Sequence, residues 1–314
     1  MPQQSYLEVN GKRVKVSNLE KVLYPATGFT KADVIDYYTR ISPLLLPHLK
    51  DRPISLKRYP DGVDGFFFYE KQCPSHRPDW VTTSRVPRQR RPGFIDYCVI
   101  NDLSALVWAA NLADLELHTF LHRGPQLENP DFLVIDLDPG PPADLINCCD
   151  VALRLKAFLD HFDLQSFPKT SGSKGLQVYV PLNTKAGYDV TKPFAHALAE
   201  HLESENPDLV VSKMQKRVRP GKVFVDWSQN DEHKTTICVY SLRAKEHPTV
   251  STPVSWSEVA DARKKRDTSL LTFETSDVLR RVKKKGDLFA PVLALKQRLP
   301  SYQRTAMNTN VVVR

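Results

Sequence analysis

The sequence has little of what typifies secreted, disulfide-stapled or membrane-embedded proteins. Only five of its 314 residues are cysteine, and no two of them form a C-x-x-C pair. A structural zinc site is therefore not indicated, and we expect scattered, reduced thiols. The sequence also lacks any apolar run of about 18 residues, which excludes a membrane-spanning helix. Its first residues, MPQQSYLEVNGKRVKV, contain no apolar signal segment, so we expect no secretory leader.

The overall composition is that of a folded, basic protein. Hydrophobic residues make up 41% and charged residues 25%, which excludes a wholly disordered chain. The 44 Lys and Arg outnumber the 36 Asp and Glu, for a formal net charge of +8. This excess favours an anionic partner, with nucleic acid or nucleotide as the first expectation and an acidic membrane as the second.

The first part of the chain mixes strand and helix patterns. Alternation around Asn10-Gly11 predicts a β-hairpin over 6–17. A helix is expected from Thr30, where Thr30 and Asp33 can cap it, and Pro43 and Pro47 are expected to break or kink its continuation. Two strands joined by a turn are predicted over 53–70, and a helix over 102–117.

The second part adds further strands and helices. A buried strand is predicted over 130–140, and two antiparallel strands over 222–230 and 235–243. The remaining expectations are helices over 143–161 and 191–204, strands within 167–182, and a helical tail from 254. The pattern predicts one α+β domain of two lobes, with a boundary near 120–130.

The sharpest local signal is Asp136-Leu137-Asp138 at the end of an apolar strand. The two-residue period of a strand places both carboxylates on one face. Two neighbouring carboxylates repel unless a cation lies between them, and Mg²⁺ or Mn²⁺ prefers such oxygen ligands. The plainer alternative is a surface Asp-Leu-Asp turn.

A third acid, Asp226, lies in the apolar run Val-Phe-Val-Asp-Trp. An unpaired buried charge is unfavourable, so acids in such runs are uncommon. Three acids on neighbouring strands could hold two metal ions for phosphoryl transfer. The alternative for Asp226 is an ordinary ion-pair acid.

The segment Thr170-Ser171-Gly172-Ser173-Lys174-Gly175 joins two predicted strands. Small residues let backbone N–H groups approach phosphate oxygens, and Lys174 adds a charge. It is not a Walker A loop, and a simple hairpin turn is the alternative. Nearby cations would face the same carboxylates if the two predicted strands pair, or else form a solvated basic face: Lys213, Lys216, Arg217, Arg219, Lys222 and Arg243.

Four aromatic residues, 66–69, follow Lys57 and Arg58 in sequence. Strand alternation leaves some of these rings outside the core, where they could stack on bases. Burial of both faces of the strand between lobes explains the pattern equally well.

In their order, these segments resemble the archaeo-eukaryotic primase-polymerase superfamily, and most closely the polymerase domains of bacterial ligase D. The resemblance covers about residues 6–300. It is carried by NLEKVLYP (18–25), DLD (136–138), TSGSKGL (170–176), VFVDWSQN (223–230) and KTTICVYSLR (234–243).

The resemblance implies one catalytic domain over 6–300, with an N-terminal lobe over about 6–125 and a catalytic-sheet lobe over about 126–300. An RRM-like antiparallel sheet carries the carboxylates, and 301–314 is a weakly structured tail. The family also implies a cytoplasmic, nucleoid-associated location in a bacterium or archaeon.

The resemblance assigns roles to individual residues. Asp136, Asp138 and Asp226 are implied as catalytic ligands of two divalent ions, Mn²⁺ or Mg²⁺. The implied nucleotide contacts are Lys57, His118, Ser171, Lys174, Arg219 and Arg243, with Gln177 at a position where the family usually has His. The implied pocket for a DNA 5′-phosphate is Asn18, Lys21 and Lys31, and the aromatics implied beside the template base are Phe68 and Tyr69.

Gln177 is the departure that matters among these motifs, and Tyr69 also differs from the Phe that is usual in the family. Glutamine can donate a hydrogen bond but carries no positive charge, so triphosphate affinity or metal preference is expected to differ. No ligase K-x-D-G motif occurs, so DNA sealing would need another chain or domain.

The resemblance implies a template-directed nucleotidyltransferase that fills or extends DNA ends in non-homologous end joining, with ribonucleotides favoured. Expected partners are gapped or broken DNA, nucleoside triphosphates, Ku and a DNA ligase. The alternatives are a primase that makes primers de novo and a non-catalytic end-binding protein. A metal-dependent glycosyltransferase would also use Asp-x-Asp, but Asp226 and the Ser171–Lys174 loop argue against it.

Overall fold

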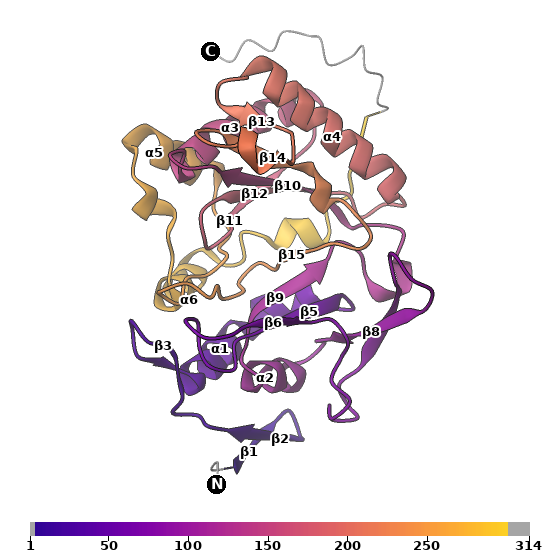
Figure 1. The fold of residues 1–314 in the computed structure, drawn as a ribbon, viewed down its shortest axis with the longest axis vertical. Coiled ribbons are helices and arrows are strands. Elements are labelled where there is room, and N and C mark those ends of the chain that lie inside the picture. The colour runs from indigo at the N-terminus through magenta and orange to yellow at the C-terminus, as the bar shows by residue number, and fades with distance from the viewer. Residues whose placement is uncertain (1–3, 301–314) are drawn as a thin grey trace. The chain divides into compact units, whose positions relative to one another are not determined.

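The computed structural model describes residues 4–300, which form two compact units (Figure 1). Among the described residues, unit 1 consists of 4–127, Thr235–Ser251 and Phe273–Asp287, and unit 2 consists of Glu128–Lys234, Thr252–Thr272 and 288–300. The predicted lobe of residues 126–300 is therefore divided between the two units. The predicted tail of residues 301–314 lies outside the described residues.

Unit 1 is built on a six-stranded antiparallel sheet. Its strands, in spatial order, are β15 (Thr235–Ile237), β9 (Asp114–Phe120), β5 (Pro53–Arg58), β8 (Phe94–Val99) and β7 (Thr83–Pro87), and β6 (Phe68–Glu70) also pairs with β5. Two small sheets accompany it: β1 (Gln4–Val9) with β2 (Lys12–Ser17), and β3 (Val22–Tyr24) with β4 (Phe29–Thr30). The predicted hairpin is confirmed, because Asn10 and Gly11 both have the positive φ of a tight hairpin turn.

Three helices complete unit 1: α1 (Lys31–Leu49), α2 (Leu103–Asn111) and α6 (Thr275–Lys285). Helix α1 begins as predicted, with Thr30 and Asp33 forming a capping box. The predicted break at Pro43 and Pro47 is wrong, because α1 continues through both. Its buried face, which includes Ile41 and Leu45, holds the helix against the core despite the missing N–H groups.

The predicted helix over 102–117 is wrong in its second half. Helix α2 ends at Asn111, Ala113 has a φ of 57°, and strand β9 starts at Asp114. Pairing of β9 with β5 and β15 overrides the helical tendency of this leucine-rich segment.

Unit 2 is built on a five-stranded sheet in the order β11 (Phe167–Thr170), β12 (Leu176–Pro181), β10 (Phe132–Pro139), β14 (Val223–Asp226) and β13 (Val210–Val211). All neighbours are antiparallel except β13 and β14. The helices are α3 (Leu145–His161) and α4 (Tyr188–Glu205), which pack on the sheet, and α5 (Trp256–Lys265), which packs on α3 (Figure 1). The predicted α+β class with antiparallel sheets is therefore confirmed.

Five short 3₁₀ helices occur: η1 (Gly124–Gln126), η2 (Lys216–Val218), η3 (Trp227–Gln229), η4 (Thr268–Leu271) and η5 (Ala290–Leu293). Among the helices formed by residues 4–300, none combines the length and apolarity needed to cross a membrane.

The expected pairing of residues 222–230 with 235–243 is wrong. β14 pairs with β10 in unit 2, whereas β15 pairs with β9 in unit 1. Two strand patterns joined by a short polar loop usually indicate a hairpin. Here β14 pairs with β10 and β15 pairs with β9 instead. Arg243 therefore lies in unit 1 and not on the sheet of the carboxylates.

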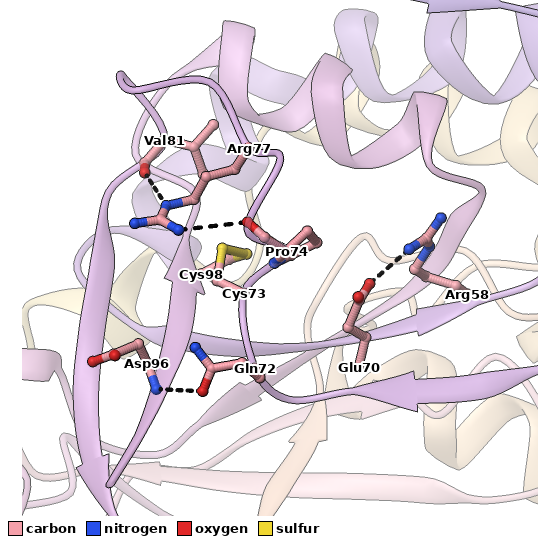
Figure 2. The surroundings of a disulfide bond; sticks show 9 residues. All are labelled: Arg58, Glu70, Gln72, Cys73, Pro74, Arg77, Val81, Asp96 and Cys98. Carbon is pink, nitrogen blue, oxygen red and sulfur yellow. Dashed lines mark hydrogen bonds and ion pairs between the residues drawn. A yellow bond between two sulfur atoms is a disulfide. The ribbon is translucent and has the colours of Figure 1, made fainter.

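The expectation of reduced thiols is also wrong for two cysteines. Cys73 and Cys98 form a disulfide (Figure 2). The Cys73 amide donates to the Asp96 carbonyl at 2.7 Å, and the Asp96 amide donates to Gln72 at 3.3 Å. The disulfide and these bonds attach the chain after β6 to β8. Three buried cysteines form no disulfide: Cys148, Cys149 and Cys238.

Candidate functional site

A row of polar side chains crosses four strands of the unit 2 sheet. Asp136 on β10 is the direct partner of Gln177 on β12 and of Asp226 on β14, and Gln177 is in turn the partner of Lys169 on β11. Directly opposed residues of antiparallel strands project on the same face. Lys169, Gln177, Asp136 and Asp226 therefore line one face, which Asp138, two residues along β10, also shares.

Asp136 is the most strongly perturbed member of this row. It is only 9% exposed, and its Oδ1 has no hydrogen-bond partner. Burial, followed by repulsion from Asp138 and Asp226, raises the pKa of Asp136 well above its usual value, and a hydrogen bond from Gln177 and the charge of Lys169 only partly oppose this. A cation beside Asp136 would relieve this repulsion.

Asp226 has a different environment. Its Oδ1 accepts hydrogen bonds from the Ser228 amide at 2.9 Å and the Ser228 hydroxyl at 2.5 Å, and its Oδ2 accepts one from Gln229 at 3.0 Å. Asp226 thereby caps η3. These bonds fix the direction of the carboxylate, and they also give it a structural role that does not require a metal.

The three acids fit a hard divalent cation by their chemistry. They offer carboxylate oxygens on one face, and one buried oxygen of Asp136 has no hydrogen-bond partner. Asp138 is exposed. Within residues 4–300, no three His, Cys, Asp or Glu side chains converge closely enough to ligate a single ion. The sheet therefore supplies the donors on one face but does not itself bring them together.

The loop between β11 and β12 is fixed by Ser171 and Gly175. The Ser171 hydroxyl accepts hydrogen bonds from the amides of Ser173 at 3.2 Å and Gly175 at 3.1 Å. A Cβ on Gly175 would lie 2.0 Å from the Leu137 carbonyl oxygen, so only glycine fits. Lys174 is exposed at the loop tip. The loop therefore lies directly against the Asp-Leu-Asp strand.

Arg219 lies on the same face of the sheet. Its guanidinium carbon is 3.6 Å from the centre of the Phe224 ring, and Phe224 is the strand partner of Asp138. The guanidinium also donates to the Met214 carbonyl oxygen at 2.5 Å. The structure thus places Asp136, Asp138, Asp226, Gln177 and Arg219 on one face of the sheet, with Ser171 and Lys174 in the adjoining loop.

Unit 1 holds a separate cluster around Glu116, whose side chain is 2% exposed. The Glu116 Oε2 lies 3.1 Å from Lys57 Nζ and 2.9 Å from His118 Nε2. The Glu116 Oε1 lies 3.3 Å from Arg243 Nε and accepts a hydrogen bond from the Ala244 amide at 3.0 Å. The structure therefore joins Lys57, His118 and Arg243, which the family resemblance implied as nucleotide contacts, through one acid that it did not include.

The pKa values of Glu116 and His118 are both lowered, for different reasons. Burial alone raises the pKa of Glu116, but the hydrogen bond with His118 and the charges of Arg243, His118 and Lys57 outweigh it and lower that pKa. Burial lowers the pKa of His118, and Glu116 opposes this by favouring the protonated imidazole.

The aromatic run 66–69 leaves rings at the surface, as alternation predicts. Phe66, Phe67 and Tyr69 are 71%, 47% and 51% exposed. Phe68 stacks on Phe66, with ring centres 5.9 Å apart. Tyr69 makes an edge contact with the His118 ring at 5.7 Å. Tyr69 therefore adjoins the Glu116 cluster, and base stacking by Phe68 and Tyr69 stays a prediction.

Asn18, Lys21 and Lys31 also come together in unit 1. The Lys21 amide donates to the Asn18 carbonyl at 3.0 Å, and the Lys31 amide donates to the Lys21 carbonyl at 2.8 Å. The Lys21 ammonium pairs with Asp61 at 2.9 Å, and the buried Lys31 ammonium donates to the Ser17 carbonyl at 3.0 Å. The three residues gather at the start of α1, where backbone donors and the helix dipole favour an anion.

Sequence reasoning missed two members of these clusters, Glu116 and Lys169. Lys169 is fully buried, and its Nζ lies 5.5 Å from the centre of the Tyr179 ring. Glu116 lies between Leu115 and Leu117, and the same signal that drew attention to Asp226 could have been applied to it. Lys169 lies between Pro168 and Thr170, and its sequence gives no such signal.

Comparisons with known proteins identify the family of this chain. Residues 30–289 match the family model described as "LigD, primase-polymerase domain". The multifunctional non-homologous end joining protein LigD of Mycolicibacterium smegmatis is 41% identical over 287 residues, which covers 90% of this chain and 36% of that protein. The bifunctional LigD of Bacillus subtilis is 34% identical over 275 residues, covering 87% of this chain and 43% of that protein.

A solved structure is similar throughout. It is the polymerase domain from Mycobacterium tuberculosis ligase D in complex with DNA, with a TM-score of 0.83 and 39% identity, covering 91% of this chain and 99% of that chain. This chain therefore spans well under half of the two LigD proteins but nearly all of that separate domain. The chain belongs to the LigD primase-polymerase domain family.

Proposed function

We propose that this chain is a template-directed nucleotidyltransferase that fills or extends DNA ends during non-homologous end joining. The observation that carries the proposal is the acid row in unit 2. Asp136 and Asp226 are strand partners, Asp138 shares their face, and a buried oxygen of Asp136 has no hydrogen-bond partner. Membership of the LigD primase-polymerase domain family supports a polymerase reaction at these acids.

Asp136, Asp138 and Asp226 would hold two divalent ions, Mn²⁺ or Mg²⁺. The bound ions supply charge stabilisation at the transferring phosphoryl group and favour attack by a deprotonated 3′-hydroxyl. The hydrogen bonds from Ser228 and Gln229 orient Asp226 for this task. Gln177 orients Asp136 by donating to it.

The triphosphate contacts in unit 2 are proposed for Ser171, Lys174, Gln177 and Arg219. Arg219 rests on the Phe224 ring, which leaves an always-charged planar group on the acid-bearing face. Lys174 is exposed beside that face. These cations oppose the charge of the acids and would favour an anionic substrate there.

Lys57, His118 and Arg243 of unit 1 are proposed as further nucleotide contacts, and Phe68 and Tyr69 as stacking surfaces for the template. The cations around Glu116 outnumber the acid. Exposed rings such as Tyr69 suit base stacking, which tolerates any sequence.

Asn18, Lys21 and Lys31 are proposed to bind a 5′-phosphate on the downstream strand. This pocket favours end filling over primer synthesis de novo, because a primase has no downstream phosphate to read. The proposed partners are gapped or broken DNA, nucleoside triphosphates, Ku and a DNA ligase, with ribonucleotides favoured over deoxyribonucleotides.

The test uses a labelled gapped duplex with a 5′-phosphate, Mn²⁺ and each nucleotide in turn. We expect the wild-type chain to add the nucleotide complementary to the template, and a ribonucleotide faster than its deoxy counterpart. Asp136→Ala should add none. As a control, Asp160→Asn changes an exposed α3 acid that pairs with Lys156 and should extend normally. Absence of wild-type extension, or extension that ignores the template, would contradict the proposal.

A further inference from the structure

Glu116 makes more polar contacts than a simple ion pair requires. A carboxylate has about four acceptor positions. Lys57, His118, Arg243 and the Ala244 amide lie 2.9–3.3 Å from its two oxygens, and Tyr59 also makes a side-chain hydrogen bond with it. With its side chain 2% exposed, Glu116 has almost no surface with which to contact a substrate itself.

The strand register accounts for part of this geometry. Glu116 on β9 is the direct partner of Lys57 on β5, so their side chains share a face. His118 follows two residues along β9 and shares that face. Arg243 reaches the cluster from the segment after β15. Glu116 is thus a side chain that Lys57, His118 and Arg243 all contact.

Aromatic rings restrict Lys57 further. Its Nζ lies 5.2, 4.8 and 5.5 Å from the ring centres of Tyr59, Phe67 and Tyr69. Cation–π attraction and the bond to Glu116 together hold this flexible chain in place. Lys57 and Arg243 together carry more positive charge than Glu116 neutralises, which favours an anionic ligand.

We propose that Glu116 is a positioning residue that holds Lys57, His118 and Arg243 in one fixed arrangement for binding the incoming nucleotide. The inference rests on the proposed function, because it concerns the nucleotide contacts named there. Pre-ordered donors lose less side-chain entropy when an anion binds. The alternative role for Glu116 is to neutralise buried charge, with no consequence for nucleotide binding.

The first test measures the titration of His118 by NMR in nucleotide-free protein, for the wild type and Glu116→Gln. The groups that face His118 are Glu116, Lys57, Arg243 and Tyr69. Glutamine keeps the shape of the side chain but removes the charge that favours imidazolium. We therefore expect His118 to titrate at a lower pH in the variant. This result does not depend on polymerase activity.

The second test separates KM from kcat in the gapped-duplex assay. Glu116→Gln should raise the nucleotide KM about tenfold or more, with a smaller fall in kcat, because binding contacts are lost before the chemical step. The matched control is Glu70→Gln in the same sheet, which removes the 2.7 Å pair with Arg58 and leaves the cluster intact. Its KM should stay at the wild-type value.

Glu116→Asp covers the case in which Glu116→Gln does not fold. Aspartate keeps the charge but is too short to span all the donors, so its KM should lie between those of the wild type and Glu116→Gln. A wild-type KM in a folded variant would overturn the proposal, whether or not the His118 titration changes. If the wild-type protein adds no nucleotide, the proposed function is refuted. The His118 titration can still be interpreted, because it is measured without nucleotide.

Discussion

The two polar clusters of this protein surround their acids with different charges. In unit 2, three acids share a sheet face, and Asp136 keeps a buried oxygen without a hydrogen-bond partner. In unit 1, Glu116 is an acid in contact with Lys57, His118 and Arg243. In the first cluster the acids repel one another, and in the second the acid is surrounded by groups that carry or accept positive charge.

The difference shows how the charged groups of a buried cluster indicate the sign of the charge on its ligand. Buried charge is unfavourable unless it is paired, so an imbalance that folding leaves in place suits a ligand of opposite charge. The acid face therefore suits a divalent cation, and the Glu116 cluster suits a phosphate. The pKa values agree, since that of Asp136 is raised and that of Glu116 is lowered.

The largest expected effect concerns Asp226. Asp226→Ala should reduce kcat about a thousandfold or more, because it removes a metal ligand. Ser228→Ala removes a hydrogen bond to Asp226 but keeps the carboxylate, and should reduce kcat only several-fold. Single-turnover extension measures both. Equal losses in the two variants would mean that Asp226 is only a cap of η3.

Removing a cation from the Glu116 cluster should weaken nucleotide binding. Lys57→Met is expected to raise the nucleotide KM by about 10- to 100-fold, as for the loss of a charge-assisted contact. Steady-state kinetics with one nucleotide would show this. Lys50→Met, on an exposed lysine after α1, is the control and should leave KM unchanged. A fall in kcat alone would contradict the assignment of Lys57 to nucleotide binding.

Neutralising one acid in each cluster should change stability in opposite directions in metal-chelated protein. Glu116→Gln should lower the free energy of unfolding by about 1.5 kcal/mol or more, because charged hydrogen bonds are lost. Asp136→Asn should raise it by about 1 kcal/mol, because a buried, repelled charge is removed. Urea unfolding at neutral pH measures both. Destabilisation by both substitutions would contradict the comparison.

The smallest expected effect concerns the DNA end. Wild type should bind a gapped duplex with a 5′-phosphate several-fold more tightly than its 5′-hydroxyl counterpart, because a terminal phosphate carries more charge. The double variant Lys21→Ala/Lys31→Ala should lose this preference. Fluorescence anisotropy at about 100 mM salt would measure it. Equal affinity of the wild type for both duplexes would instead favour primer synthesis.

Local patterns predicted much of the fold and part of the site. The Asn10-Gly11 turn, the capping box at Thr30 and the strand that carries Asp136 and Asp138 all depend on residues close in sequence. Alternation also predicted exposed rings in the 66–69 run. These features result from backbone preferences and from the periods of helix and strand.

Pairings over long sequence separations could not be predicted in this way. The pattern of 235–243 indicates a strand but does not say that β15 joins β9 in the other unit. The same limit applies to the helix predicted over 102–117, whose second half becomes β9 because β5 and β15 pair with it. Similarly, α1 continues past Pro43 because packing of its buried face stabilises it.

The sequence by itself determined that this is a basic α+β protein with Asp136 and Asp138 on one strand face and a Ser-Gly loop joining two further strands. Only the tertiary structure placed Asp226 and Gln177 opposite Asp136 and enclosed Glu116 among its three partners. The physical reason is that strand alternation is set by neighbouring residues. The register between strands, and the partners of a buried charge, are set by packing across the whole unit.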